Sequence, residues 1–142
     1  MKIAIINGPN LNMLEYREKE IYGDYTYHDI EIIIRENAKS EDEISFFQSN
    51  HEGAIIDYLH TIIIEKYDAL IINPAAYSHY SYAIYDALLM FKGIKVEVHL
   101  SDINNRDEFR KVSITGKACD KIISGLQINS YLEGLKYIYQ NK

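Results

Sequence analysis

The pattern of hydrophobic and polar positions changes its period several times along the chain. Short runs rich in apolar residues, each bounded by polar residues, predict strands that are largely buried. These runs lie at residues 2–7, 43–49, 69–73 and 94–100, with a shorter candidate at 121–125. Between them lie longer segments in which apolar residues recur every three or four positions, as in amphipathic helices.

The helical segments carry recognisable end signals. Thr26 followed by Asp29 has the pattern of a capping box, which predicts the start of a helix. Asn50 is expected to cap the next helix, and Gly93 is a typical glycine after a helix C-terminus. The expected helices lie at about residues 26–39, around the apolar stripe 55–63, at 80–92 and at 129–140, with a short one in the charged stretch NNRDEFRK.

Strands and helices thus alternate in the order βαβαβαβ(α)βα, which predicts a parallel sheet with helices on both faces. The runs 2–7 and 69–73 are nearly all apolar, as strands covered on both faces require. We therefore expect a five-stranded, flavodoxin-like α/β fold. The chain contains no internal repeat, linker or low-complexity tract, so we expect one domain over residues 1–142.

Composition narrows the classes of function. The net charge of −6 disfavours a nucleic-acid partner or an anionic membrane surface. Cys119 is the only cysteine, so an internal disulfide is impossible, and this fits a reducing compartment. Met1 leads directly into a strand without a signal-peptide pattern, and no apolar stretch is long enough for a membrane span. A cytoplasmic location is the expectation.

Candidate chemistry lies where the predicted strands end. Ligands of open α/β sheets bind beyond the carboxyl ends of the strands. The polar residues that follow the first, third and fourth main strands are Asn7, Asn10, Arg17 and Tyr22, then Asn73, Ser78 and His79, then His99, Ser101, Arg106 and Arg110. Three strand ends that converge with these residue types predict a polar pocket.

The segment VEVHL contains a further signal. Side chains alternate along a strand, so Glu97 and His99 should share one face while Val96 and Val98 share the other. A carboxylate and an imidazole on a buried sheet face are hard to explain by packing alone. They fit acid–base chemistry.

Other catalytic constellations are absent. The chain contains no GxGxxG or phosphate-binding loop after its first strand, no CxxC or HExxH, and no GxSxG. We therefore expect acid–base chemistry on a small molecule, without a metal or cofactor. Two alternatives remain at this level, a flavin-binding relative of flavodoxin and a non-catalytic binding or scaffold protein on the same fold.

Several longer motifs together resemble the type II 3-dehydroquinate dehydratase family. They are INGPNLNML, REKEIYG, QSNHEG, INPAAYSH, VEVHLSD and RDEFR, in this order along nearly the whole chain. The resemblance implies a flavodoxin-like fold, a homododecamer built from four trimers, and no cofactor. It also implies the reaction, which removes water from 3-dehydroquinate to give 3-dehydroshikimate.

The resemblance also implies roles for individual residues. Tyr22 matches the catalytic base, Arg17 the arginine that keeps it ionised, and His99 the general acid. Asn10 matches a residue that stabilises the enolate, and Glu97 the carboxylate that orients the histidine. The matches to substrate-binding positions are Asn73, His79, Asp86, Leu100, Ser101 and Arg110, of which Asp86 acts across a subunit boundary in the family.

This reading explains the long polar stretch after the first strand, residues 7–24. It is expected to be a lid that carries Arg17 and Tyr22 and excludes water when it closes. Within it, Glu15 and Tyr16 stand where the family commonly has Gly and Thr, which places a negative charge close to Arg17 in the sequence.

Overall fold

Five parallel strands pair side by side in one sheet. In the computed structural model, which describes residues 1–142, the strands are β1 (Lys2–Asn7), β2 (Glu43–Gln48), β3 (Ala69–Asn73), β4 (Ile94–His99) and β5 (Lys121–Ser124). Their order is β2-β1-β3-β4-β5, and every neighbouring pair is parallel. This is the flavodoxin-like order, in which the strand order reverses between β1 and β3. The predicted fold class is confirmed.

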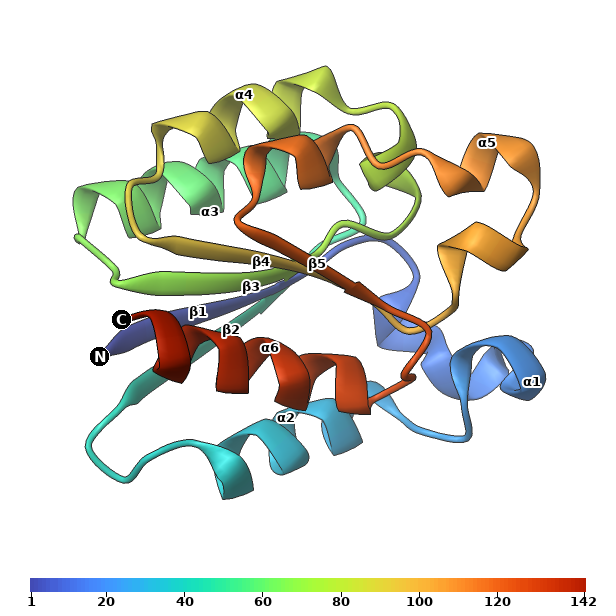
Figure 1. The fold of residues 1–142 in the computed structure, drawn as a ribbon, viewed down its shortest axis with the longest axis horizontal. Helices are drawn as coiled ribbons and strands as arrows, with labels where there is room; N and C mark the ends of the chain where they lie inside the picture. The colour runs from blue at the N-terminus through green and yellow to red at the C-terminus, as the bar shows by residue number, and fades with distance from the viewer.

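Helices cover both faces of the sheet. They are α2 (Tyr27–Asn37) and α6 (Asn129–Asn141) on one face, and α3 (Glu52–Ile64) and α4 (Tyr82–Met90) on the other (Figure 1). Alternation along β1 divides the core accordingly: Ile3 and Ile5 join the cluster under α2 and α6, whereas Ala4 and Ile6 join the cluster under α3 and α4. None of the helices combines the length and the apolarity that crossing a bilayer requires.

The predicted helix starts are partly correct. The capping box is present, because the Thr26 hydroxyl accepts from Asp29 N and the Asp29 carboxylate accepts from Thr26 N. The prediction for Asn50 is wrong. Helix α3 begins at Glu52 after His51, without a side-chain cap. The Asn50 carboxamide instead accepts a hydrogen bond from Asn10 N at 3.0 Å, and this bond ties the loop after β2 to the loop after β1.

The predicted end of the third helix is also wrong. Helix α4 ends at Met90, and Phe91 has extended backbone angles, so Gly93 is not the glycine that terminates it. Gly93 is needed for a different reason. A Cβ atom at this position would lie 2.2 Å from the Asp68 carbonyl oxygen, so only glycine allows this approach of the two loops.

The long stretch after β1 is more regular than its sequence indicates. It contains two short helices, η1 (Leu11–Tyr16) and α1 (Lys19–Tyr22). Leu11, Leu14 and Tyr22 are buried in the core cluster under α2 and α6. The other short helices are η2 (Ala75–His79), η3 (Ile103–Asn105), α5 (Glu108–Lys111) and η4 (Thr115–Ala118).

The loops after β1 and β3 touch backbone to backbone. Gly8 N donates a hydrogen bond to Asn73 O at 2.8 Å. A Cβ atom on Gly8 would lie 2.5 Å from the Pro74 carbonyl oxygen, which is closer than real Cβ contacts. Gly8 therefore sets the distance between the two strand ends at which the polar pocket was predicted.

This close approach predicts that Gly8→Ala lowers the free energy of unfolding by about 1–3 kcal/mol, the usual cost of overpacking. Gly53→Ala is the matched control. A Cβ atom there meets nothing within 4 Å, and the position lies in the first turn of α3. This control should raise stability by up to about 1 kcal/mol. Urea unfolding measures both, and equal midpoints for the two variants would contradict the steric argument.

Candidate active site

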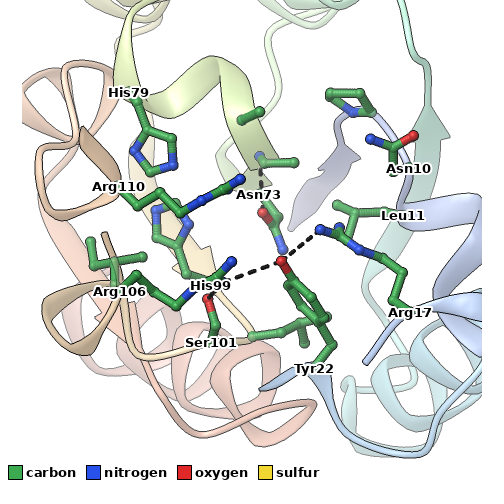
Figure 2. A pocket seen from close by; sticks show the side chains of 15 residues that line it. Asn10, Leu11, Arg17, Tyr22, Asn73, His79, His99, Ser101, Arg106 and Arg110 are labelled. Carbon is green, nitrogen blue, oxygen red and sulfur yellow. Dashed lines mark hydrogen bonds between the residues drawn. The ribbon is translucent and has the colours of Figure 1, made fainter. Parts of the chain in front are cut away.

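A cavity of about 120 Å³ opens at the carboxyl ends of β1, β3 and β4 (Figure 2). Of the predicted site residues, those that line it are Asn10, Arg17, Tyr22, Asn73, His79, His99, Leu100, Ser101 and Arg110. Two others do not line it. Glu97 lies beneath His99 in the sheet, and Asp86 lies on the exposed face of α4.

Two arginines converge on the oxygen of Tyr22, from opposite sides in Figure 2. Arg17 Nη2 donates to this oxygen at 2.6 Å, and Arg106 Nη1 donates to it at 3.2 Å. The guanidinium carbon of Arg17 also lies 3.8 Å from the centre of the Tyr22 ring. Tyr22 is only 8% exposed, so water screens these charges weakly. Two cationic donors therefore meet at one buried oxygen.

Arg106 was not assigned a role from the sequence beyond its place after the fourth strand. It follows η3, and the chain there folds back over the cavity. Arg106 Nη1 also donates to Ser101 Oγ at 3.1 Å, which links the end of β4 to Tyr22. Glu15 forms no ion pair with Arg17. Glu15 therefore does not compete with Tyr22 for the Arg17 guanidinium.

His99 and Glu97 lie side by side on β4, as strand alternation predicts. His99 Nε2 lies 2.8 Å from Glu97 Oε2. Glu97 is 0% exposed and His99 is 5% exposed, at the floor of the cavity. One hydrogen bond thus joins the ring to the carboxyl group of Glu97. The other ring nitrogen, Nδ1, makes no hydrogen bond within the chain and is free for a ligand.

Tyr131, to which no role was assigned from the sequence, positions the carboxamide of Asn73. Asn73 Nδ2 donates to Tyr131 Oη at 3.3 Å, and Tyr131 donates in turn to the side-chain oxygen of Asn7. Tyr131 is fully buried in α6, and burial raises the pKa of its phenol far above the ordinary value, so it stays a neutral donor. Asn73 Oδ1 accepts from Ala75 N at 3.1 Å. Together these bonds fix which way the carboxamide faces.

His79 and Arg110 supply polar groups on the side of the cavity next to η2. His79 Nδ1 lies 2.9 Å from the Val112 carbonyl oxygen, to which it donates. Burial lowers the pKa of His79, and this hydrogen bond opposes the shift only in part. The ring is therefore neutral and presents Nε2 as an acceptor. Arg110 Nε is buried without a hydrogen-bond partner in the chain, so it can donate to a ligand oxygen.

The fold and the site together define a class of protein. It is a flavodoxin-like α/β protein whose cavity at the β1–β3 switch point is lined by a tyrosine, two histidines and three arginines. The chain belongs to the class II dehydroquinase family, whose model matches residues 1–139. The family predicted from the motifs, a family of lyases, is thereby confirmed.

Individual relatives agree over nearly the full length. The 3-dehydroquinate dehydratase of Thermotoga petrophila is 50% identical over 139 residues, which is 97% of this chain and 94% of the relative. That of Clostridium perfringens is 52% identical over 136 residues, 93% of this chain and 92% of the relative. The type II dehydroquinase structure from Butyrivibrio crossotus superimposes with a TM-score of 0.94 at 45% identity, covering 98% of this chain and 97% of that one.

The neutral state of His79 gives a pH prediction. Its pKa in the folded chain lies below the ordinary value of about 6.5. As the pH falls, His79 is therefore protonated in the unfolded chain before it is protonated in the folded chain. The stabilising contribution of the neutral ring is complete above about pH 6.5 and is lost as the pH falls through the folded pKa. NMR titration of the ring, assigned by the signal that disappears in His79→Gln, should give a midpoint below 6.5. A midpoint at or above that value would contradict the assignment.

Proposed function

We propose that this chain is a 3-dehydroquinate dehydratase, which eliminates water from 3-dehydroquinate to give 3-dehydroshikimate through an enolate. Residues 1–142 are the catalytic domain of this proposal, and the reaction needs neither metal nor cofactor. The names of the relatives support the substrate. The observation that carries the proposal is the oxygen of Tyr22, bound by two guanidinium groups in a cavity that His99 also lines.

Tyr22 is the base of this mechanism. A neutral phenol is a poor base, and with an ordinary pKa of about 10 only about one tyrosine in a thousand is ionised at pH 7. Arg17 and Arg106 donate to the oxygen and stabilise the phenolate. The phenolate takes the proton next to the substrate ketone, and the electron pair moves onto the ketone oxygen. Asn10, in the wall of the cavity, stabilises the enolate formed there.

His99 is the acid. It protonates the departing hydroxyl group, which leaves as water while the enolate collapses to the conjugated ketone. Glu97 accepts from Nε2 and stabilises the positive ring that precedes this transfer. One proton thus goes to Tyr22 and one leaves His99, and exchange with water restores both groups.

The remaining residues bind the substrate. The backbone N–H groups near Leu100 and Ser101 hold the substrate carboxylate, and the unpartnered donor of Arg110 binds a substrate hydroxyl. His79 and Asn73 contact further hydroxyl groups from the other side of the cavity. The segment 7–24 acts as the lid, and Leu11 and Leu14 pack against the core.

The conjugated product absorbs in the ultraviolet, so its appearance from 3-dehydroquinate tests the proposal directly. Tyr22→Phe removes only the oxygen and should lower kcat by about 10²–10⁴-fold, the range for a lost general base. Wild type should stay active after borohydride treatment, because no lysine Schiff base is involved. A wild type that is folded but inert would favour a non-catalytic binding protein on this fold. A yellow purified protein would instead indicate a bound flavin.

The proposed setting is the cytoplasmic shikimate pathway, which leads to chorismate and the aromatic amino acids. The proposed assembly is a homododecamer, a tetramer of trimers, in which Asp86 reaches the cavity of a neighbouring subunit. Two features of the α4 region support an interface. Asp86 is exposed and makes no hydrogen bond or ion pair within its own chain, and nearby Tyr80 and Tyr82 are 58% and 67% exposed. Exposed tyrosines are enriched in interfaces.

Sedimentation and activity together test this assembly. Wild type should sediment as a dodecamer. Asp86→Ala should lose about tenfold or more in activity, as for a lost hydrogen bond to a charged group, with an unchanged unfolding midpoint. A monomer with full activity, or an Asp86→Ala protein as active as wild type, would overturn the cross-subunit role.

A further inference from the structure

The buried carboxylate of Glu97 has more partners than its bond to His99. Glu97 Oε2 accepts from Ser113 Oγ as well as from His99, and Glu97 Oε1 accepts from Thr115 Oγ1. Thr115, like Glu97, is 0% exposed. Both hydroxyl groups come from the segment before and within η4, which packs against β4 from outside the sheet. We refer to Ser113 and Thr115 as the hydroxyl cradle.

A backbone donor orients the hydroxyl group of Ser113. Gly116 N donates to Ser113 Oγ at 2.9 Å, so the hydroxyl proton of Ser113 is available for Glu97. Gly116 itself lies against the carboxylate, because a Cβ atom there would be 2.9 Å from Glu97 Oε2. The hydrogen bonds thus run from Gly116 N to the Ser113 hydroxyl and from that hydroxyl to the Glu97 carboxylate.

The hydroxyl cradle affects whether the proton between Glu97 and His99 lies on the carboxylate or on the ring. A buried Glu–His pair can hold its proton on the carboxylate or on the ring. Glu97 has no lysine or arginine within ion-pair distance, so burial alone favours the neutral carboxyl group. Two hydroxyl donors favour the carboxylate instead, because they stabilise the charged acceptor. The proton then stays on His99 Nε2.

We propose that Ser113 and Thr115 are positioning residues that keep Glu97 an ionised acceptor of the Nε2 proton, so that His99 can carry on Nδ1 the proton it gives to the leaving hydroxyl. Neither residue lines the cavity, and both act through Glu97. The expected effect on kcat rests on the proposed function. The structural consequence of the proposal, the protonation of His99 Nε2, does not depend on any substrate.

Two substitutions at Thr115 separate the hydroxyl group from packing. Thr115→Val keeps the volume of the side chain and removes the hydroxyl, whereas Thr115→Ser keeps the hydroxyl and removes a methyl group. The proposal expects a kcat about tenfold or more lower for Thr115→Val, as for a lost hydrogen bond to a charged group, with KM within about twofold of wild type. Thr115→Ser should restore most of kcat. The opposite order would show that Thr115 acts by packing and would overturn the proposal.

Hydrogen exchange tells which half of the reaction is affected. In D2O, an enolate that forms but fails to lose its hydroxyl returns to substrate with deuterium beside the ketone, once the proton taken up by Tyr22 has exchanged with solvent. Thr115→Val should therefore raise the ratio of deuterium incorporation to product formation, since base function at Tyr22 is intact while acid function is impaired. An unchanged ratio alongside a lower kcat would mean that the hydroxyl does not act through His99.

The free protein provides a readout without substrate. The ¹⁵N spectrum of the His99 ring should show a protonated Nε2 in wild type and Thr115→Ser. Protonation of Nε2 should decline in Thr115→Val. It should also decline in Ser113→Ala, which replaces Thr115→Val if that variant does not fold. An identical Nε2 signal in all these proteins overturns the proposal. If wild type is inert toward 3-dehydroquinate while the Nε2 signals change as expected, the proposed function fails and the cradle stands.

Discussion

The site depends on the parallel register of β1 and β3. Their last residues, Asn7 and Asn73, lie opposite each other, and Gly8 N closes the junction by its bond to Asn73 O. Tyr131 rises from α6 beneath this junction and binds both carboxamides. A displacement of either strand end would move the loops that carry the cavity walls. The single missing Cβ atom at Gly8 is therefore as important to the site as the polar residues around it.

Local and global charge act in opposite directions in this chain. The net charge is −6, yet the cavity is lined by Arg17, Arg106 and Arg110 together with two histidines. At short range and low exposure the local cations dominate the potential, because distant surface charges are screened by salt over about 10 Å. The cavity is therefore suited to a small anion, whereas the net negative charge disfavours polyanions. Burial lowers the pKa of His79, so this histidine adds no positive charge to the lining near neutral pH.

Sequence alone predicted what depends on local pattern. The strands follow from apolar runs, the start of α2 from Thr26 and Asp29, and the pairing of Glu97 with His99 from alternation. What depends on tertiary approach was not predictable. Asn50 does not cap α3, because its side-chain oxygen accepts from Asn10 N. Gly93 is required because it lies close to the Asp68 carbonyl oxygen in another loop. Arg106 reaches Tyr22 across 84 residues of sequence, and no local period marks it.

The two proton-transfer groups of the proposed mechanism are supported in different ways, and this difference suits their tasks. Tyr22 sits on a four-residue helix and is held mainly by arginines from two other segments, contacts that open if that helix moves away. His99 ends a central strand and leans on a fully buried carboxylate, which is 0% exposed. If the segment 7–24 opens as the proposed lid, a base carried on it lets substrate enter and product leave. An acid fixed in the sheet keeps its distance to the leaving group constant through every cycle.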